Sequence, residues 1–382
     1  MGCCCKKRKK INKINIDLLL GDDSEIMDSR NSGPETLLNE VKLKMSIDKF
    51  QIIKLLGTGT FGKVLLVKLK TTKAYYAMKV LNKKMLKLKE QEIHTKNERD
   101  IMVEINSPFI INIKFAFQDD INLYLVSEFM QGGELFFHLK NKKFFDEELV
   151  KLYTMELVLA LTHIHEKDAV YRDLKPENIL IDKDGHIKLT DFGLCKIIKD
   201  DDKAYTICGT ITYLAPEILL NKGYQKEVDW WSLGCVVYRM LEGRSPFGSP
   251  RGQLTLSYFK QKITFKNNVS EEAKDFVKSL LIFDPEKRLG YGNNGSDDIK
   301  NHAFFRGMDW TKVYNKEYQP SFVPQLTNDL DLKYFDKNFT DEKISVDDLK
   351  SDENNETLNY TNFSFVDKDM QNENDNQLFS NV

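Results

Sequence analysis

An ordered set of short polar motifs constrains this chain more than any other feature. Asp173 and Asn178 stand in the segment 170–178, and Asp191 follows in Thr190-Asp191-Phe192-Gly193. A few carboxylate and amide oxygens are the hard ligands that suit Mg²⁺ held jointly with nucleotide phosphates. Asp173 is a carboxylate that could accept the proton of an attacking hydroxyl. The set is too specific for a chance collection of turns, so it predicts a phosphoryl-transfer site.

A glycine-rich segment precedes these motifs and reads Gly57-Thr58-Gly59-Thr60-Phe61-Gly62-Lys63-Val64. Glycines let backbone approach phosphates without a Cβ clash, although a simple glycine-rich hairpin would look the same. No helix and no Gly-Lys-Ser/Thr follows, which excludes the dinucleotide-binding and P-loop patterns. A predicted strand follows instead and carries Lys79, which can reach the α- and β-phosphates. Glu98, on the next predicted helix, is the candidate partner of that lysine.

The motif order, completed by Ala215-Pro216-Glu217, resembles that of the eukaryotic protein kinases. Tyr171 stands where most kinases have His, a change that is usual in the AGC group. Further matches are Gly132-Gly133-Glu134-Leu135, Asp229-Trp230-Trp231-Ser232-Leu233-Gly234 and Arg288 in Asp284-Pro285-Glu286-Lys287-Arg288-Leu289-Gly290. From about Phe50 to Phe365 the chain is most similar to the protein kinase B family, but without the lipid-binding domain that usually precedes the kinase in that family.

The resemblance implies an α+β, bilobal fold. It has a small β-rich N-lobe with one key helix, a larger helical C-lobe, and a C-terminal tail that wraps back to the N-lobe. We expect a tail and linker over residues 1–49, the kinase domain over 50–305, and the AGC-type tail over 306–382. Apolar periodicity predicts helices over 90–105, 149–166, 223–242 and 270–281, with a strand over 122–129.

The resemblance implies an ATP- and Mg²⁺-dependent serine/threonine protein kinase. It makes Asp173 the catalytic base, places Lys175 near the γ-phosphate, and assigns the metal to Asn178 and Asp191. The implied ATP-binding residues are Leu56, Gly57, Gly59, Gly62, Val64, Ala77, Lys79, Glu128, Glu134, Asn178 and Asp191, with Glu98 holding Lys79. Ser127 is small where many kinases carry Met, which predicts room behind the adenine.

Two phosphorylation switches are implied by the AGC resemblance. Thr206, between Asp191 and Glu217, matches a threonine phosphorylated by an upstream kinase that resembles the phosphoinositide-dependent kinase. A phosphate of roughly −2 charge needs cationic partners to order a loop, and the matching residues are Arg172, Lys196 and His94.

The second switch is Ser364 in Tyr360-Thr361-Asn362-Phe363-Ser364-Phe365, which resembles the AGC hydrophobic motif. Phe363 and Phe365 would dock in an apolar groove of the small lobe, beside the helix with Glu98. Burial of two Phe side chains contributes several kcal/mol at roughly 25 cal/mol per Å². Asp347 replaces the expected turn-motif phosphosite, with Ser345 nearby.

The first ten residues, Met1-Gly2-Cys3-Cys4-Cys5-Lys6-Lys7-Arg8-Lys9-Lys10, predict membrane attachment. Gly2 would be myristoylated, and palmitoylation of Cys3, Cys4 or Cys5 would add a second anchor, because one acyl chain binds membranes only marginally. The basic residues would add roughly 1 kcal/mol each at an anionic leaflet. A merely solubilising or nucleolar-type basic tail is the alternative. We therefore expect the protein at the cytoplasmic face of a membrane.

The substrates are expected to be proteins with basic residues before the target Ser or Thr, since Glu134 and Glu177 match family acids that bind arginine. Ile211-Thr212 replaces the usual Pro-Glu, and Arg239 replaces the usual acid. We therefore expect basic selectivity three residues before the target and weaker selectivity elsewhere.

Several alternatives compete with an active kinase. The formal net charge of −2 gives no global bias toward nucleic acid. A pseudokinase would lack Lys79, Asp173 or Asp191, and all three are present. A small-molecule kinase would lack the Ala-Pro-Glu segment and the AGC tail. Cys195 and Cys208 could form a regulatory disulfide, but two thiols are favoured, because the six cysteines form no disulfide framework.

Overall fold

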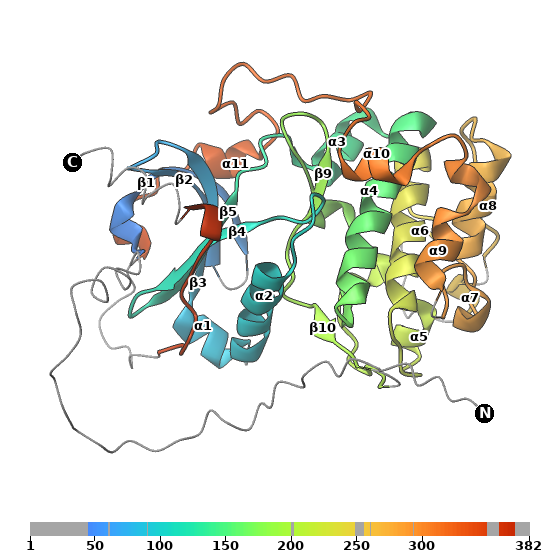
Figure 1. Cartoon of the computed structure of the whole chain (residues 1–382), viewed down its shortest axis with the longest axis horizontal. Coiled ribbons are helices and arrows are strands. Elements are labelled where there is room, and N and C mark those ends of the chain that lie inside the picture. Colours follow the sequence, from blue (N-terminus) through green and yellow to red (C-terminus); the bar gives the residue numbers. More distant parts are fainter. Residues whose placement is uncertain are drawn as a thin grey trace, which may run out of the picture. The chain divides into compact units, whose positions relative to one another are not determined.

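The computed structural model describes residues 45–59, 62–89, 91–199, 202–248, 256–259, 261–292, 294–349 and 359–370. The predicted lipidation sites Gly2, Cys3, Cys4 and Cys5 lie outside these ranges. None of the helices within these ranges is long and apolar enough to cross a membrane. The strands gather in one lobe and most helices in the other, which confirms the predicted bilobal α+β fold (Figure 1).

The small lobe is an antiparallel sheet with the strand order β1-β2-β3-β5-β4-β11. The rings of Phe50, Phe117 and Tyr124 stack in series in its core, with centroids 5.9 and 4.7 Å apart. Its strands are β1 (Phe50–Gly59), β2 (Gly62–Leu69), β3 (Tyr75–Asn82), β4 (Ile113–Gln118), β5 (Asn122–Glu128) and β11 (Phe365–Val366).

Two helices belong to the small lobe, α1 (Lys83–Leu88) and α2 (Glu92–Glu104). Helix α2 confirms the helix predicted over 90–105. It buries Thr95, Glu98 and Ile101, which are three residues apart and so lie on one helical face. Helix α1 was missed, because its lysine-rich sequence has no clear apolar period; it begins where the Asn82 side chain accepts a hydrogen bond from the Met85 amide at 3.1 Å.

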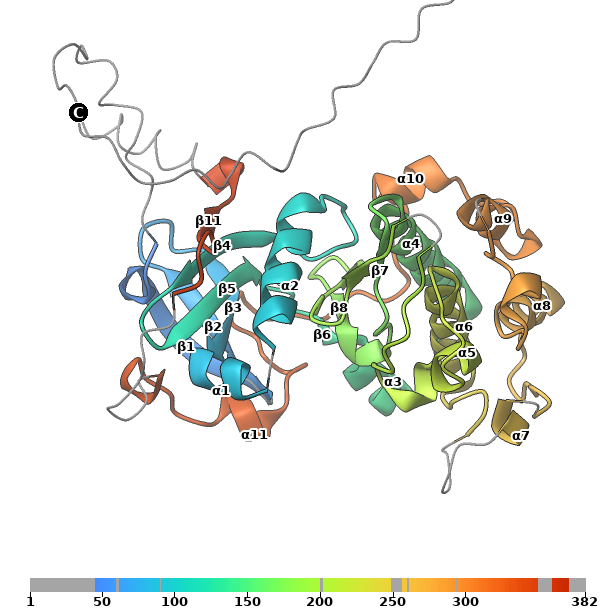
Figure 2. The same cartoon turned by 90° about the horizontal axis from the view of Figure 1, so that it is seen from below.

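The large lobe is built around α4 (Glu147–Glu166) and α6 (Glu227–Glu242), which pack against each other (Figure 2). Helix α4 begins where Asp146 accepts a hydrogen bond from the Leu149 amide. The other helices are α3 (Leu135–Lys142), α5 (Pro216–Leu219), α7 (Leu256–Phe259), α8 (Glu271–Leu280), α9 (Gly295–Lys300) and α10 (Trp310–Tyr314). Short strands are β6 (Gly133–Glu134), β7 (Ala169–Val170), β8 (Ile179–Ile181), β9 (Ile187–Leu189) and β10 (Lys196–Ile197).

The helix predicted over 223–242 begins later than expected, at Glu227. Tyr224 exchanges two backbone hydrogen bonds with Ala204, at 2.9 and 3.0 Å, in an isolated antiparallel bridge. These bonds hold Tyr224 in an extended conformation that no helix can continue, and they tie the segment after β10 to the start of α6.

The C-terminal segment returns to the small lobe, as the fold prediction required. Helix α11 (Lys337–Thr340) packs against β1. Strand β11 then pairs with β4 at the edge of the sheet, with Phe365 opposite Ala116 and Val366 opposite Phe115 (Figure 2). The segment therefore contacts two separate parts of the small lobe.

Candidate active site

A cavity of about 290 Å³ lies where the strands of the small lobe face the loops of the large lobe. All the predicted ATP-binding residues line it except Gly59 and Gly62, and Glu98 lines it as well. Ser127, predicted to leave room behind the adenine, and Glu177, predicted to bind a substrate arginine, line it too. The lining residues that no prediction named are Met102, Ile113, Leu125, Phe129, Met130, Leu180, Thr190 and Phe335. All of these except Thr190 are apolar, and only Leu125, Phe129 and Met130 lie in or directly after the strand predicted over 122–129.

Gly62 has a packing role away from the cavity. A Cβ atom built on Gly62 would lie 1.7 Å from the Val80 carbonyl oxygen on the paired strand β3. Any other residue would push β2 from β3, and so would displace Lys79 beside Val80. Gly57, in contrast, lines the cavity with no atom within 4 Å of its missing Cβ, which leaves open space for a ligand.

Phe335 comes to the cavity from the C-terminal segment. Its ring stacks on Phe129, just after β5, with centroids 5.6 Å apart and planes inclined by 26°. The cavity is therefore closed on one side by a residue far away in the sequence.

Lys79, on β3, joins the two lobes electrostatically. Its Nζ lies 2.7 Å from Glu98 on α2 and 3.2 Å from Asp191 in the large lobe. Burial alone would lower the pKa of Lys79, but the two carboxylates outweigh burial and raise it above its ordinary value. The charge of Lys79 in turn lowers the pKa of Asp191. Lys79 and Asp191 are thus both charged at neutral pH.

The loop after β7 brings Asp173, Lys175 and Asn178 together. Lys175 Nζ donates to Asp173 Oδ2 at 2.7 Å, and Asn178 Nδ2 donates to the same oxygen at 2.9 Å. Lys175 also donates to Thr210 Oγ1 at 3.2 Å. Asp173 is therefore oriented by two donors, the cationic Lys175 and the cavity-lining Asn178.

Asp229, at the start of α6, holds this loop in place through hydrogen bonds to its backbone. Its fully buried carboxylate accepts hydrogen bonds from the amides of Tyr171 and Arg172, at 2.9 and 2.8 Å, and contacts His165 Nε2 at 2.8 Å. Arg172 has a positive φ of 69°, a conformation that a non-glycine residue adopts only when its surroundings hold it. Asp229 provides that restraint directly before Asp173.

Asp191 and Asn178 fit a divalent cation site in the donor groups they offer. Both line the same cavity, one with a carboxylate and one with an amide oxygen, and Asp191 is half-exposed toward it. Mg²⁺ commonly takes one or two protein carboxylates and completes its shell with phosphates and water. Among the described residues, no group of three or more His, Cys, Asp or Glu side chains is placed to hold a metal ion by itself.

Thr206 is exposed in the segment between Asp191 and Glu217. Its carbonyl accepts a hydrogen bond from the Tyr224 hydroxyl at 2.7 Å, and Arg172 donates to that same hydroxyl at 3.1 Å. Lys196 is exposed on β10, and His94 is half-buried on α2. Of the three predicted cationic partners, Arg172 is linked to Thr206 through one side chain.

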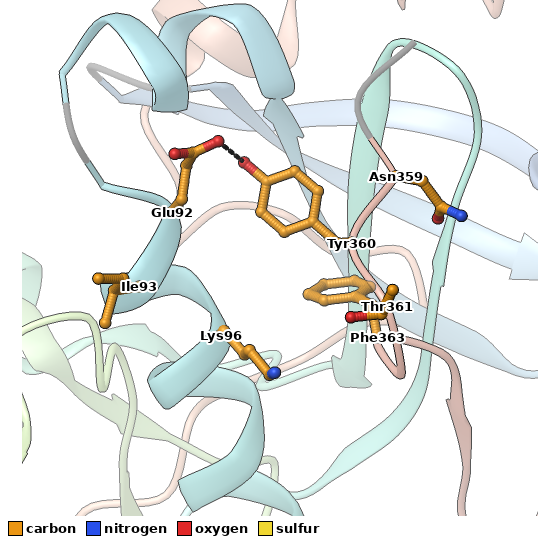
Figure 3. Close-up of a pocket in the computed structure, with 7 residues that line it drawn as sticks. All are labelled: Glu92, Ile93, Lys96, Asn359, Tyr360, Thr361 and Phe363. Atoms are coloured by element: carbon orange, nitrogen blue, oxygen red, sulfur yellow. Dashed lines mark hydrogen bonds between the residues drawn. The ribbon is translucent and has the colours of Figure 1, made fainter. Parts of the chain in front are cut away.

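A second cavity, of about 250 Å³, lies between α2 and the C-terminal segment (Figure 3). Phe363 is 1% exposed there, and the Arg99 guanidinium lies over its ring at 5.8 Å. Tyr360 exchanges hydrogen bonds with the Gln118 side chain through its amide and carbonyl, and its hydroxyl donates to Glu92. Phe363 and Tyr360 thus pack beside the helix that carries Glu98, while Ser364 is exposed.

The family profile described as "Protein kinase domain" matches residues 50–305. The serine/threonine-protein kinase AtPK1/AtPK6 of Arabidopsis thaliana is 41% identical over 355 residues, which are 93% of this chain and 76% of that protein.

Two further relatives are similar at the same level. The serine/threonine-protein kinase YPK1 of Saccharomyces cerevisiae is 45% identical over 301 residues, 78% of this chain and 44% of that protein. The human RAC-beta serine/threonine-protein kinase is 43% identical over 314 residues, 82% of this chain and 65% of that protein. This chain thus spans less than two thirds of the length of these two relatives.

Proposed function

The chain belongs to the protein kinase family as a serine/threonine kinase of the AGC type, and we propose that its kinase domain (50–305) transfers the γ-phosphate of ATP by the residues described above. The observation that carries this proposal is the joint position of Lys79, Asp191 and Asn178 on one cavity, beside Asp173 and Lys175. In phosphoryl transfer a protein mainly positions the reactants and neutralises charge.

In the proposed reaction Asp173 accepts the proton of the substrate hydroxyl, and Lys175 stabilises negative charge at the transferred phosphate. Lys79, held by Glu98, orients the α- and β-phosphates. Asp191 and Asn178 would hold Mg²⁺, which would neutralise negative charge on the phosphates. The backbone beside Glu128 and the carboxylate of Glu134 would bind adenine and ribose.

A phosphotransfer assay on arrayed Ser/Thr peptides tests these roles. We expect Asp173→Asn and Asp191→Asn to lower kcat by more than about a thousandfold, since each removes positioning and charge at the transferred phosphate. Asp168→Asn is the matched control, because Asp168 is exposed and forms a surface ion pair with Lys226. Full activity of Asp173→Asn would refute the assignment of the base.

The C-terminal segment 306–382 is proposed as an activating tail with Ser364 as its regulatory phosphosite, and Thr206 as a second regulatory phosphosite within the kinase domain. The contact of Phe363 beside α2 supports this, because α2 carries Glu98 and so influences Lys79. The link from Thr206 through Tyr224 to Arg172 supports the first switch. We expect Thr206→Ala to abolish most activity and Ser364→Ala to reduce it; a fully active Thr206→Ala would contradict the proposal.

We further propose that acylation at Gly2 and at Cys3, Cys4 or Cys5, with the five basic residues after them, attaches the kinase to the cytoplasmic face of a membrane. The support is the sequence of this segment. Cell fractionation should find wild type in the membrane pellet and Gly2→Ala in the supernatant. A soluble wild type would overturn the proposal.

The proposed substrates are proteins with a basic residue three positions before the target Ser or Thr, and the activating enzyme is a second protein kinase. Glu134 and Glu177 both line the cavity, near Lys175. Burial, and then the charge of Glu177, raise the pKa of Glu134, so this acidic pair gains from a cation supplied by a substrate. Peptides with Arg or Ala at that position test this preference.

A further inference from the structure

We propose that Arg239 forms a subsite for an anionic side chain of the substrate, a carboxylate or a phosphate, next to the acidic subsite of Glu134 and Glu177. This inference rests on the proposed phosphorylation of protein substrates. It adds a second, oppositely charged feature to what the enzyme recognises.

The guanidinium of Arg239 is held in one place. Arg239 Nη1 donates to the Tyr213 hydroxyl at 2.5 Å, and its Cζ lies 5.2 Å from the centroid of the Phe136 ring. The side chain, on α6, is half-buried. A guanidinium packed against an aromatic face loses little further freedom when it binds an anion.

Most of the donor capacity of Arg239 is uncommitted. A guanidinium carries five N–H donors in a planar fork, and Tyr213 takes one of them. Within the described ranges Arg239 forms no ion pair with any carboxylate, whereas Arg288 on the same lobe is paired with Glu217. A partly desolvated, unpaired cation with free donors favours a carboxylate or phosphate ligand.

The two residues that hold Arg239 come from segments close to the reacting centre. Tyr213 ends a short 3-10 helix (Ile211–Tyr213) directly after Thr210, which contacts Lys175 and Asp173. Phe136 lies on α3, two residues after Glu134. The two groups that hold Arg239 thus belong to the segments that border the catalytic loop.

The acidic subsite is close to this cation without neutralising it. Burial raises the pKa of Tyr213, Arg239 opposes that rise, and Glu177 adds to it, so both charges act on this one hydroxyl. Oε2 of Glu177 is buried without a hydrogen-bond partner. A buried, unsatisfied carboxylate oxygen costs free energy until a donor reaches it. Two opposite charges near one tyrosine predict a substrate with a basic and an acidic group close together.

A simpler alternative is that Arg239 only fills space and removes a second basic preference. The two cases differ in one measurement. An anion subsite makes Glu better than Gln at one peptide position, whereas a filler leaves Glu and Gln equal at every position.

The test uses the full chain and a peptide set with one Arg three positions before Ser, and Ala elsewhere. Each other position in turn carries Glu, phosphoserine, Gln or Lys. The readout is the ratio of kcat/KM between peptides for one enzyme preparation, because the degree of activation cancels in that ratio. Binding of the same peptides, followed by fluorescence anisotropy, gives the ratio for variants that turn over slowly.

We expect wild type to favour Glu, phosphoserine or both over Gln by roughly tenfold at one position, the ratio that a charge-assisted hydrogen bond supports. Whether carboxylate or phosphate is favoured identifies the natural ligand. Arg239→Gln should abolish the ratio, Arg239→Glu should reverse it in favour of Lys, and Tyr213→Phe should reduce it. Arg306→Gln, at an exposed arginine of the same lobe, should leave it unchanged.

Equal use of Glu, phosphoserine and Gln at every position by wild type would overturn the inference, as would a preference that survives in Arg239→Gln. The proposed basic preference is tested separately by the Arg and Ala peptides. If that basic preference is absent, the ratio of kcat/KM between the Glu and Gln peptides can still be measured.

Discussion

The guanidinium of Arg288 donates two hydrogen bonds to the carboxylate of Glu217, at 2.6 and 2.9 Å, inside the large lobe. The two side chains are 0% and 3% exposed, and Arg288 also stacks on Trp231 at 5.1 Å. The pair joins the end of the segment that contains Thr206 to the loop after α8. Loss of one partner would leave the other charge buried and alone.

We therefore expect Glu217→Gln and Arg288→Met each to lower the free energy of unfolding by about 3–5 kcal/mol, the range for breaking a buried ion pair. Urea denaturation measures this change. Lys287→Ala, which removes an exposed ion pair with Asp284, should change it by less than about 1 kcal/mol. Equal effects of the buried and exposed substitutions would contradict this account.

Asp229→Asn is expected to damage activity more than stability. The amides of Tyr171 and Arg172 donate to different oxygens of Asp229. Asn keeps one oxygen and replaces the other with an NH₂ group, so one of the two amides loses its acceptor. We expect a loss of about 1–3 kcal/mol in stability, the cost of unsatisfied buried donors. Displacement of Asp173 should lower kcat by at least roughly a hundredfold. Steady-state kinetics and denaturation on one preparation measure both, and a wild-type kcat would refute the positioning role.

The parts of this site that could be predicted from the sequence are those whose chemistry lies within a few residues. Asp173, Lys175 and Asn178 are such a group, because their spacing alone brings them to one loop. Pairs such as Lys79 and Glu98 needed the motif order as well, since many lysines and glutamates are merely solvated. Individual helices such as α2 and α4 were predicted in the same local way, from apolar periodicity.

Contacts across the chain could not be predicted in this way. The stacking of Phe335 on Phe129 closes the cavity, but no pattern in the sequence around either residue indicates that the two are in contact. The backbone bridge between Ala204 and Tyr224 makes α6 begin later than the local apolar periodicity predicts. The pinning of Arg239 by Tyr213 and Phe136 likewise depends on three separate elements.

Ser127→Met is expected to reduce the potency of bulky ATP-competitive inhibitors. Ser127 lines the cavity at the end of β5, and the longer Met side chain would occupy part of its 290 Å³. We expect at least a tenfold rise in the inhibition constant, since a steric overlap costs on the order of 1–3 kcal/mol. Ser127→Ala keeps the space and should keep the sensitivity. Equal potency against wild type and Ser127→Met would contradict the prediction.

Cys195 should resist alkylation across a wide pH range. The structure has Cys195, Cys208 and Cys235 as free thiols within the described ranges. Burial raises the pKa of Cys195 to about 12, so its reactive thiolate stays scarce as the pH rises from 7 to 10. In the unfolded chain the thiol of Cys195 ionises at a lower pH, about 9, than in the folded protein. Ionisation of Cys195 therefore lowers the free energy of unfolding as the pH rises from about 9 toward 12.

Peptide mapping by mass spectrometry after iodoacetamide treatment compares the labelling of Cys195 with that of Cys208. Cys208 is half-buried in the segment near Thr206 and should be labelled first. Cys195 should be labelled only after denaturation. Rapid labelling of Cys195 in the native protein at pH 8 is the contrary result, and so is an isolated peptide pair joined through Cys195 and Cys208.

Phe363→Ala is expected to release the C-terminal segment from the small lobe and to lower activity through α2. The ring is 1% exposed and packs against Tyr360 and Arg99, so its loss removes about 3–5 kcal/mol of packing. That amount is enough to separate β11 from β4, where only two residues pair. Glu98 would then lose a neighbouring restraint on its helix, and its contact with Lys79 would weaken.

Hydrogen exchange of Phe363→Ala should be faster at residues 365–366 and along α2 than in wild type, and kcat should be lower. Phe144→Ala, at a ring that is 48% exposed, is the control and should change neither quantity. Faster exchange at β11 with unchanged exchange along α2 would show that the docked segment does not control the helix.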